Sequence, residues 1–491
     1  MLKSLPSERW DFTTAAHLLN RAGFGGPPAE ISELARLGQA GAVSRLLDFE
    51  SVAEPTSDPA WAKPDPDRTE RLQAARMAGP EERRKLQREE QVNQRERMVG
   101  LRAWWLERMA SGARPLQEKM TLFWHGHFAT SMVKVRDAYL MWRQNDLFRR
   151  LGTGHWPELL IATARDPAML IWLDQAQSRK EHPNENFARE VMELFTLGEG
   201  HYTERDVTEA ARALTGWSYD RRTQDFVARP RWHDEGSKTI FGQTGYFNGE
   251  DFLRLLVAQP QAARFISAKL WNFFAGEWPS EELTTALAAA FRDGGDSFKP
   301  LLRTIFLCEE FYAPSIIRNQ VKSPVQWLVG SVRVLARPLP PPLVCLNLTR
   351  NLGQDLFAPP NVKGWDGGLS WITTNTLLAR YNEAATLVQG APPPAMAGAN
   401  PKRPIAGKQI ARRLGPVRIG GVEVDKLFTE KERTEIEALI PALERRLVQA
   451  KFRPDQEKVL REYLASEPQL DDHAILNAIR LVMSTPEYQL T

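Results

Sequence analysis

Cysteine is almost missing from this chain. Only Cys308 and Cys345 occur among its 491 residues, and each stands in an apolar stretch. Cysteines in such surroundings are usually small buried side chains. No disulfide framework is therefore expected, and no cysteine spacing typical of a metal site occurs.

An excess of one charge is missing as well. The chain has 64 Lys and Arg against 61 Asp and Glu, a formal net charge of +3. A nearly neutral chain without a basic stripe has no general attraction to nucleic acid, so no nucleic-acid partner is expected. No apolar run approaches the ~18 residues of a membrane span, and residues 1–12 show no apolar signal segment. The sequence alone therefore predicts a cytoplasmic protein without a membrane span.

The familiar short catalytic motifs are absent too. The chain has no Gly-rich phosphate loop, no Gly-x-Ser-x-Gly turn and no His-Glu-x-x-His. Its composition is ordinary for a globular protein, with 42% hydrophobic and 25% charged residues. Candidate sites must therefore be sought among polar residues that packing does not require.

Apolar residues recur at helical spacing along most of the chain. Stripes of period 3.6 predict amphipathic helices at 251–257, 261–274, 280–292 and 298–307. The stretch 80–109 is dominated by Glu, Arg, Lys and Gln, which predicts a solvent-exposed helical arm. We predict an all-α, multi-helix fold with this projecting charged arm and a small irregular or β-like insertion after Trp217.

The stretch 174–217 is the most informative part of the chain. Steps of about 100° along 185–197 gather apolar residues on one face of a helix. The other face carries Glu185, Asn186, Arg189, Glu190 and Glu193. A second helix is expected to open at Thr203, because Asp206 stands at the spacing of a capping box.

Two interpretations of the polar face remain open. In the first interpretation it is a solvated face with charge pairs at i,i+4, which contribute little energy. Alternatively it is a pocket wall, in which Arg189 holds one carboxylate while Glu190 or Glu193 acts as acid, base or metal ligand. Because charge runs are usually solvated faces, the helix by itself favours the first interpretation.

Two histidine-bearing stretches add candidates. His125 and His127 flank Gly126. On a helix the two rings would point to opposite sides, whereas on an extended segment they would point the same way and could share a metal. His233 and Asp234 fit either a catalytic dyad or a capped turn.

Two further features favour structural roles. His17 and Arg21 lie at i,i+4 on one face of a short helix, and His17 is expected in the core or on the helix surface. The loop 359–371 combines glycines with Trp365 and Trp371. Exposed tryptophans could stack on sugars or bases, but buried ones would anchor the loop, which is the interpretation we favour.

Several of these stretches together resemble the bacterial domain-of-unknown-function 1800 family. The matching stretches, in chain order, are Ala16–Gly25, Phe123–Phe128, Asn184–Gly198, Tyr202–Val207, Leu214–Trp217, His233–Asp234, Gly364–Trp365 and Ser484–Tyr488. The resemblance implies one largely helical module over residues 1–491, with insertions at about 62–110, 218–246 and 390–430. It also implies a periplasmic or cell-envelope protein, and a gene that neighbours one for a phosphatase/sulfatase-like protein of family 1501.

The resemblance favours convergence of the polar residues at one site. The leading hypothesis is a metal-dependent hydrolase in which His125, His127 and Glu190 hold a divalent metal ion. His233 and Asp234 would supply acid/base chemistry, Arg189 would bind an anionic group, and Glu185 and Glu193 complete the catalytic candidates, with Asn184 and Asn186 beside them. The alternative is a non-catalytic partner or scaffold of the family 1501 protein.

Overall fold

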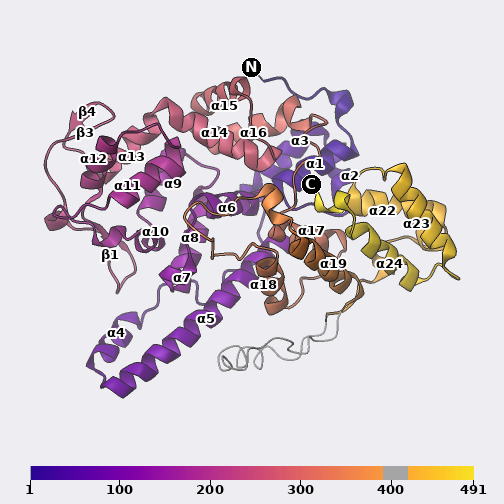
Figure 1. The fold of residues 1–491 in the computed structure, drawn as a ribbon, viewed down its shortest axis with the longest axis horizontal. Coiled ribbons are helices and arrows are strands. Elements are labelled where there is room, and N and C mark those ends of the chain that lie inside the picture. Colours follow the sequence, from indigo (N-terminus) through magenta and orange to yellow (C-terminus); the bar gives the residue numbers. More distant parts are fainter. Residues whose placement is uncertain (1, 391–418) are drawn as a thin grey trace.

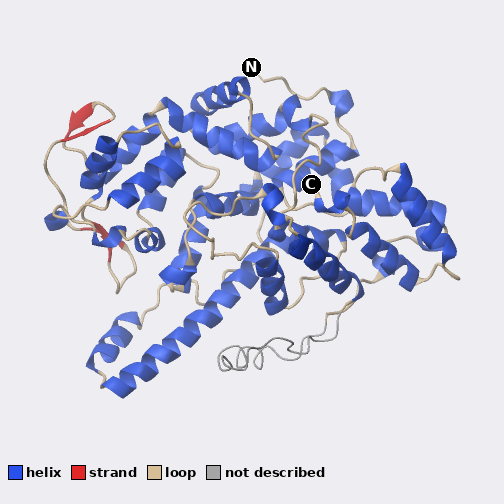
Figure 2. Cartoon of the chain, viewed as in Figure 1, coloured by secondary structure: helices blue, strands red, loops and turns tan. Residues whose placement is uncertain are grey.

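The computed structural model describes residues 2–390 and 419–491. Helices are the main secondary structure of this part of the chain, and its strands form two small two-stranded sheets (Figures 1 and 2). The predicted all-α class is therefore confirmed. The predicted insertion at 390–430 falls largely on 391–418, which lie outside the described residues.

The first third of the chain forms a helical cluster and the arm. Its helices are α1 (Phe12–Ala22), α2 (Pro28–Arg36), α3 (Gly38–Leu47), α4 (Arg68–Met77), α5 (Pro80–Ser111), α6 (Pro115–His127), α7 (Met132–Val135), α8 (Ala138–Leu151), α9 (Trp156–Ala164) and α10 (Pro167–Trp172). The projecting arm in Figure 1 consists of α4 and the first half of α5. On α5 the buried residues begin only at Met98, as its charged sequence predicts.

The middle of the chain holds the central hairpin of helices and both sheets. It comprises α11 (Glu185–Met192), a π-helical turn (Glu193–Leu197), α12 (Glu204–Leu214), β1 (Trp217–Tyr219), β2 (Phe226–Ala228), β3 (Lys238–Ile240), β4 (Gln243–Gly245), α13 (Gly249–Ala258), α14 (Pro260–Ala275), α15 (Glu281–Asp293) and α16 (Phe298–Leu307). Strands β1 and β2 pair antiparallel, as do β3 and β4. The insertion predicted after Trp217 thus consists of two short hairpins.

The last third packs at the other end of the molecule. Its helices are α17 (Pro324–Val334), α18 (Pro342–Asn351), α19 (Thr374–Gln389), α21 (Glu430–Thr434), α22 (Ile436–Leu443), a second π-helical turn (Glu444–Val448), α23 (Pro454–Ser466) and α24 (Asp472–Met483). The last turn of chain, Pro486–Gln489, returns to α17, where the Tyr488 hydroxyl lies 2.8 Å from that of Ser331.

Helix α6 lies between two hydrophobic cores. One core gathers residues of α1–α3, α9 and α11–α16, the other residues of α5, α8, α17–α19 and α22–α24. Phe123 and Trp124 belong to the first core and Leu122 to the second, so α6 is buried on all sides. Its polar side chains must therefore find partners inside the protein. This requirement determines which hydrogen bonds its two histidines make.

Candidate functional site

The two histidines of α6 point into different surroundings. The helix continues through Gly126 to His127, so the rings project to opposite sides. His125 packs against Trp105, Phe357 and Trp365, at ring-centroid distances of 5.1, 4.9 and 5.7 Å. Of the two geometries that the sequence left open, the helical one is observed.

Hydrogen bonds occupy the metal-binding nitrogens of these rings. The Phe357 amide donates to His125 Nε2 over 2.9 Å, so the proton of this neutral ring is on Nδ1. His127 Nε2 lies 3.0 Å from the Phe195 carbonyl and must donate to it, while Lys269 Nζ lies 3.3 Å from Nδ1. Neither ring therefore has an uncommitted lone pair for a metal ion.

Burial keeps both rings neutral. It lowers the pKa of His125 to about 3. Burial, with the charge of Lys269, also lowers the pKa of His127 well below its ordinary value. In the part of the chain that the structure describes, no three His, Cys, Asp or Glu side chains are placed to share a metal ion. The structure thus does not bring His125, His127 and Glu190 together as a ligand set.

Helix α11 starts as the sequence predicts. Asn184 caps it by accepting from the Phe187 amide, and the Asn184 side chain also donates to the Leu173 carbonyl over 2.8 Å. Phe187 and Ala188 are fully buried, whereas Glu185 and Asn186 are exposed. Glu185 accepts from Thr208 on α12 over 3.0 Å, and this contact ties it to the helical hairpin.

Arg189 is committed to a partner within the protein. Both of its terminal nitrogens donate to the Glu204 carboxylate over 2.7 Å, and this pair keeps the pKa of the Arg189 guanidinium above its ordinary value. To bind an anionic ligand, Arg189 would have to exchange Glu204 for it. A ligand could displace Glu204 from the solvent side, because the Glu204 side chain is 77% exposed.

The two remaining carboxylates of this face have different environments. Glu193 accepts a short hydrogen bond from the hydroxyl of Tyr202, 2.5 Å away. Glu190 is half-buried, and burial and the nearby charge of Glu193 raise its pKa, although Lys363 and Arg189 oppose that shift. Burial and the bond to Glu193 raise the pKa of Tyr202 to about 12, so the phenol stays a proton donor. A carboxyl with a raised pKa and a carboxylate that accepts a hydrogen bond thus lie one helical turn apart.

The helix changes its pitch at this pair. A π-helical turn begins at Glu193, and Thr196 Oγ1 donates to the Val191 carbonyl five residues back over 2.6 Å. Such turns are rare and often occur at functional sites.

The loop 359–371 closes over the end of α6 beside this pair. Gly364 has φ +84°, and an added Cβ there would lie 2.3 Å from the Gly126 carbonyl oxygen. This close approach requires glycine and places Lys363 where its charge acts on Glu190. Trp371 is buried and Trp365 packs on His125, which confirms that the tryptophans anchor the loop.

His233 and Asp234 form an anchored turn. Arg212 donates to both oxygens of Asp234 over 2.8 and 3.1 Å, and it holds the pKa of that carboxyl below its ordinary value. His233 Nδ1 bonds instead to the Thr215 carbonyl over 3.0 Å. The contacts of the described residues include no hydrogen bond between the His233 ring and the Asp234 carboxylate. Of the two interpretations left open, this geometry favours the capped turn.

Sequence reasoning missed three side chains of the site: Tyr202, Lys269 and Lys363. Tyr202 and Lys363 stand directly before recognisable features, the Thr203 cap and Gly364, which could have drawn attention to them. Lys269 carries no local signal, because its partners are on α6 and at the Leu194 carbonyl.

This is a largely helical protein whose candidate site lies where α11, α6 and a glycine loop meet. A family model described as "Protein of unknown function (DUF1800)" matches residues 17–490. The chain belongs to this family, as the sequence motifs predicted. No curated protein and no solved structure matches the chain. None of the described helices has the length and apolar character that a bilayer span requires.

Proposed function

We propose that Glu190, Glu193 and Tyr202 form an acid/base centre and that the protein is an enzyme of the hydrolytic type. The observation that carries this proposal is the pair of glutamates, one helical turn apart in unlike environments. Two carboxyls whose environments separate their proton affinities can serve as acid and base in one reaction. Glu190 would donate its proton to a leaving group, and Glu193 would accept one from an attacking water.

The proposal uses neither a metal ion nor the His233–Asp234 pair. Tyr202 orients the Glu193 carboxylate through its hydroxyl, and Lys363 would hold negative charge that develops near Glu190. Arg189 would bind an anionic part of the substrate after exchanging Glu204 for it.

The first test needs no substrate. The Glu190 carboxyl would be titrated by NMR with ¹³C-labelled glutamate, and its signal assigned with Glu190→Gln. We expect a pKa above the ordinary value, and a lower one in Glu193→Gln because the like charge is removed. An ordinary pKa that does not respond to Glu193→Gln would contradict the proposed centre.

The second test measures turnover. Chromogenic esters, phosphate esters and glycosides would be screened with the unmodified protein, and any activity compared in Glu190→Gln and Glu185→Gln. Loss of a general acid costs about 10²–10⁴-fold, so Glu190→Gln should lose most of the activity. Glu185 is on the same helix but is exposed and accepts from Thr208, so Glu185→Gln should retain the activity. Equal activities in the two variants would move catalysis away from this pair.

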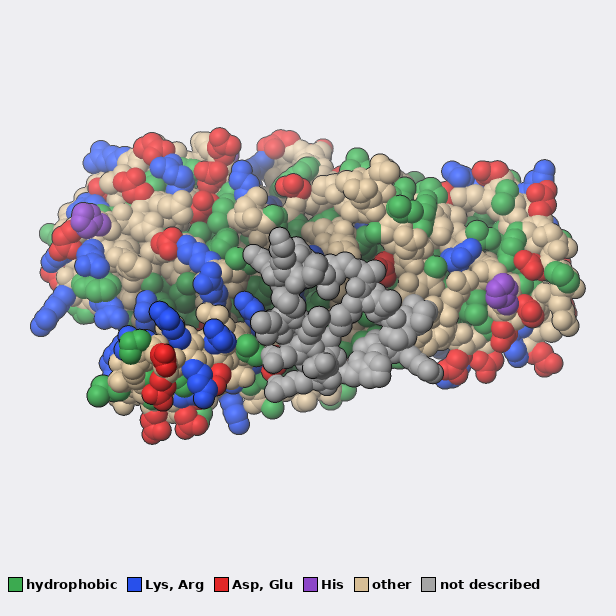
Figure 3. All heavy atoms as spheres, turned by 60° about the horizontal axis from the view of Figure 1, so that its bottom comes forward, with side chains coloured by type: hydrophobic (Ala, Val, Ile, Leu, Met, Phe, Trp, Pro, Cys, Tyr) green, Lys and Arg blue, Asp and Glu red, His purple; other side chains and the backbone are tan. Residues whose placement is uncertain are grey.

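A second candidate function rests on the arm. Clefts of about 1100 and 1430 Å³ lie between the arm and the body of the protein. Their basic lining residues are Arg68, Arg71, Arg76, Arg83, Arg95, Arg102, Lys134, Arg136, Arg221, Arg222, Arg229 and Arg350, against four acidic ones, Glu90, Asp137, Asp174 and Asp220. Figure 3 shows both kinds of charge on this side of the molecule. This surface suits an acidic patch on a protein partner.

The partner to test first is the family 1501 protein. Charge reversal by Arg76→Glu and Arg222→Glu should abolish co-purification with it, whereas Glu190→Gln should not. Retention by the charge-reversed protein would contradict a docking role for these clefts.

A further inference from the structure

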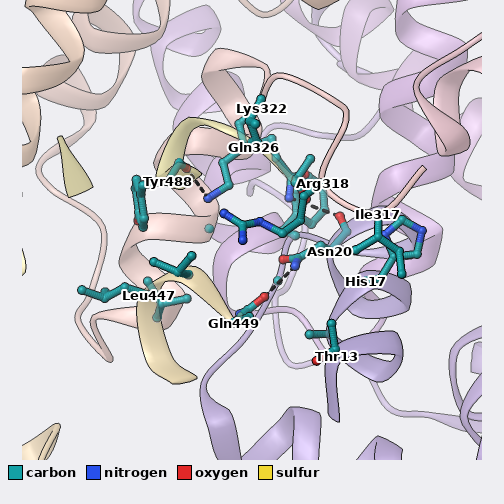
Figure 4. Close-up of a pocket in the computed structure, with 18 residues that line it drawn as sticks. Thr13, His17, Asn20, Ile317, Arg318, Lys322, Gln326, Leu447, Gln449 and Tyr488 are labelled. Carbon is teal, nitrogen blue, oxygen red and sulfur yellow. Dashed lines mark hydrogen bonds between the residues drawn. The ribbon is translucent and has the colours of Figure 1, made fainter. Parts of the chain in front are cut away.

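A second polar site lies far along the chain from the central helix. A cavity of about 30 Å³ opens where α1, the start of α17, the second π-helical turn and the last residues meet. Figure 4 shows Arg318 and Lys322 extending into the space bordered by Asn20, Gln449 and Tyr488. The first and last stretches by which the chain resembles its family therefore come together here.

Positive charge accumulates around this cavity, where Arg21 also donates to an oxygen of Thr491, the last residue of the sequence, over 2.8 Å. Arg318 and Lys322 line the cavity, and none of the described residues that line it is an Asp or Glu. Arg21, Lys119 and Arg380 lie close by: Arg380 donates to the Lys322 carbonyl over 2.8 Å and Lys119 to the lining residue Gln326. Within the described residues, none of these five cations has an Asp or Glu oxygen within 4 Å, whereas Arg102, Arg333 and Arg453 each pair with a carboxylate.

Carbonyl and amide oxygens accept the hydrogen bonds of the four cations other than Arg21 and bring no counter-charge. Lys322 Nζ donates to the Tyr488 carbonyl over 2.7 Å and lies 4.0 Å from the Tyr488 ring. The charge of Glu487 acts on Arg318, but the Glu487 carboxylate pairs with Arg453 at 3.4 Å. His17, which also lines the cavity, is kept neutral because burial and Arg21 lower its pKa.

Collecting five cations with so little opposite charge costs free energy. Burial, with the charges of Arg318 and Arg380, lowers the pKa of Lys322 to about 7. Burial and Arg21 lower the pKa of Lys119 to about 7 as well. Two buried guanidinium N–H groups, the Nε of Arg21 and of Arg380, have no hydrogen-bond partner among the described residues. An excess of buried positive charge of this kind is destabilising unless a ligand supplies more of the opposite charge.

The backbone is strained at the same place. Arg318 and Gln449 both adopt left-handed conformations, at φ +63° and +58°. Gln449 directly follows the π-helical turn and is held by the Asn20 amide, 2.6 Å away. Residues in such conformations persist where the surroundings impose them, and they cluster at ligand sites. Here the strain positions a guanidinium and an amide on opposite sides of one cavity.

We propose that this cavity binds an anionic oxygen group, a carboxylate or a phosphate, between Arg318 and Lys322. One guanidinium nitrogen of Arg318 donates to the Glu487 carbonyl over 3.1 Å. Its other N–H groups are available to a ligand, since no further hydrogen bond of this guanidinium occurs among the described residues. The cavity has room for about two water molecules, so it takes the charged end of a ligand rather than a whole metabolite. This site is independent of the glutamate pair proposed as the acid/base centre.

The test uses the full chain with phosphate, acetate and chloride as probes at equal ionic strength. Thermal unfolding and calorimetric titration would be compared for the unmodified protein, Lys322→Met, Arg318→Met and the control Lys458→Met. Lys458 is exposed on α23 and lies 3.8 Å from Glu462. We expect saturable stabilisation by phosphate or acetate in the unmodified protein and in the control. We expect the dissociation constant to rise at least about tenfold in each cavity variant, as loss of a charged hydrogen bond requires.

The outcomes separate the ligand chemistries. A response to phosphate alone identifies a phosphate site, and a response to acetate alone identifies a carboxylate site. Equal responses to all three salts, or equal responses in control and cavity variants, would overturn the proposal. Without any anion, Lys322→Met should melt no lower than the unmodified protein, because it removes an uncompensated charge. A large loss of stability in that variant would show instead that Lys322 is a structural residue.

Discussion

Glu118 holds together the junction between α5, α6 and α8. Its side chain is completely buried, and its carboxylate accepts from Arg108 over 2.6 Å, from Arg149 over 2.7 and 3.0 Å, and from Trp105 over 2.9 Å. Both arginine side chains are themselves less than a tenth exposed. Glu118→Gln would leave two buried guanidinium groups without a counter-charge.

The expected loss of stability follows from this burial. Removing one partner of a buried ion pair costs about 3–5 kcal/mol. Glutamine keeps one oxygen that can accept from an arginine, so we expect the lower end, about 3 kcal/mol. Hydrogen exchange of α6 and α8 peptides measures this loss locally, and about 3 kcal/mol corresponds to more than a hundredfold faster exchange.

An exposed ion pair provides the control. Glu281 pairs with Arg264, but its side chain is 85% exposed, so Glu281→Gln should cost less than about 1 kcal/mol. Exchange in Glu118→Gln that is no faster than in this control would refute the assignment of Glu118 as the charge that stabilises the junction.

The difference in stability between the unmodified protein and Glu118→Gln should also depend on pH. Although burial raises the pKa of Glu118, the charges and hydrogen bonds of Arg149 and Arg108 outweigh it and lower the pKa overall. A carboxyl with a depressed pKa stabilises the fold above its unfolded value of about 4.3 and ceases to do so as pH falls through its folded value. The difference in the free energy of unfolding between the unmodified protein and Glu118→Gln should therefore be largest at neutral pH and disappear in acid.

Three further substitutions test the candidate site's framework. Gly364→Ala should reduce the free energy of unfolding by more than about 2 kcal/mol and lower the melting temperature, because its Cβ would meet the Gly126 carbonyl. The control is Gly367→Ala, whose Cβ meets nothing within 4 Å. Asn184→Ala should cost about 1 kcal/mol in chemical unfolding through loss of the α11 cap, and no cost would show that the cap is dispensable. Arg189→Ala should leave the melting temperature nearly unchanged, because its partner Glu204 is exposed. Any difference should disappear in high salt. A large drop in melting temperature would contradict this prediction.

Helices with a strong apolar stripe could be predicted closely from the sequence. The stretches expected at 261–274, 280–292 and 298–307 are α14, α15 and α16, within one or two residues at each end. The capping box expected at Thr203 and Asp206 is present, with both of its hydrogen bonds. These features depend on neighbours within one or two turns, so the local sequence contains the necessary information.

The central helix contains a feature that its local sequence does not predict. A regular helix was expected over 185–197, but its last five residues form a π-helical turn. The amide of Gly198 bonds to the Glu193 carbonyl five residues back, over 3.1 Å. One extra residue in a single turn hardly changes the apolar stripe, so periodicity could not reveal it. The change matters because it alters where Glu193 points relative to Glu190.

The histidines of α6 were ambiguous for a different reason. Their partners, the Phe357 amide and the Phe195 carbonyl, are 232 and 68 residues away in the chain. A neutral imidazole can either accept or donate at Nε2, according to its tautomer. His125 accepts from an amide and His127 donates to a carbonyl, so one residue type satisfies two opposite backbone groups from a single buried helix. The same His-Gly-His spacing that suggests a metal site from the sequence therefore joins α6 to two separate segments of the fold.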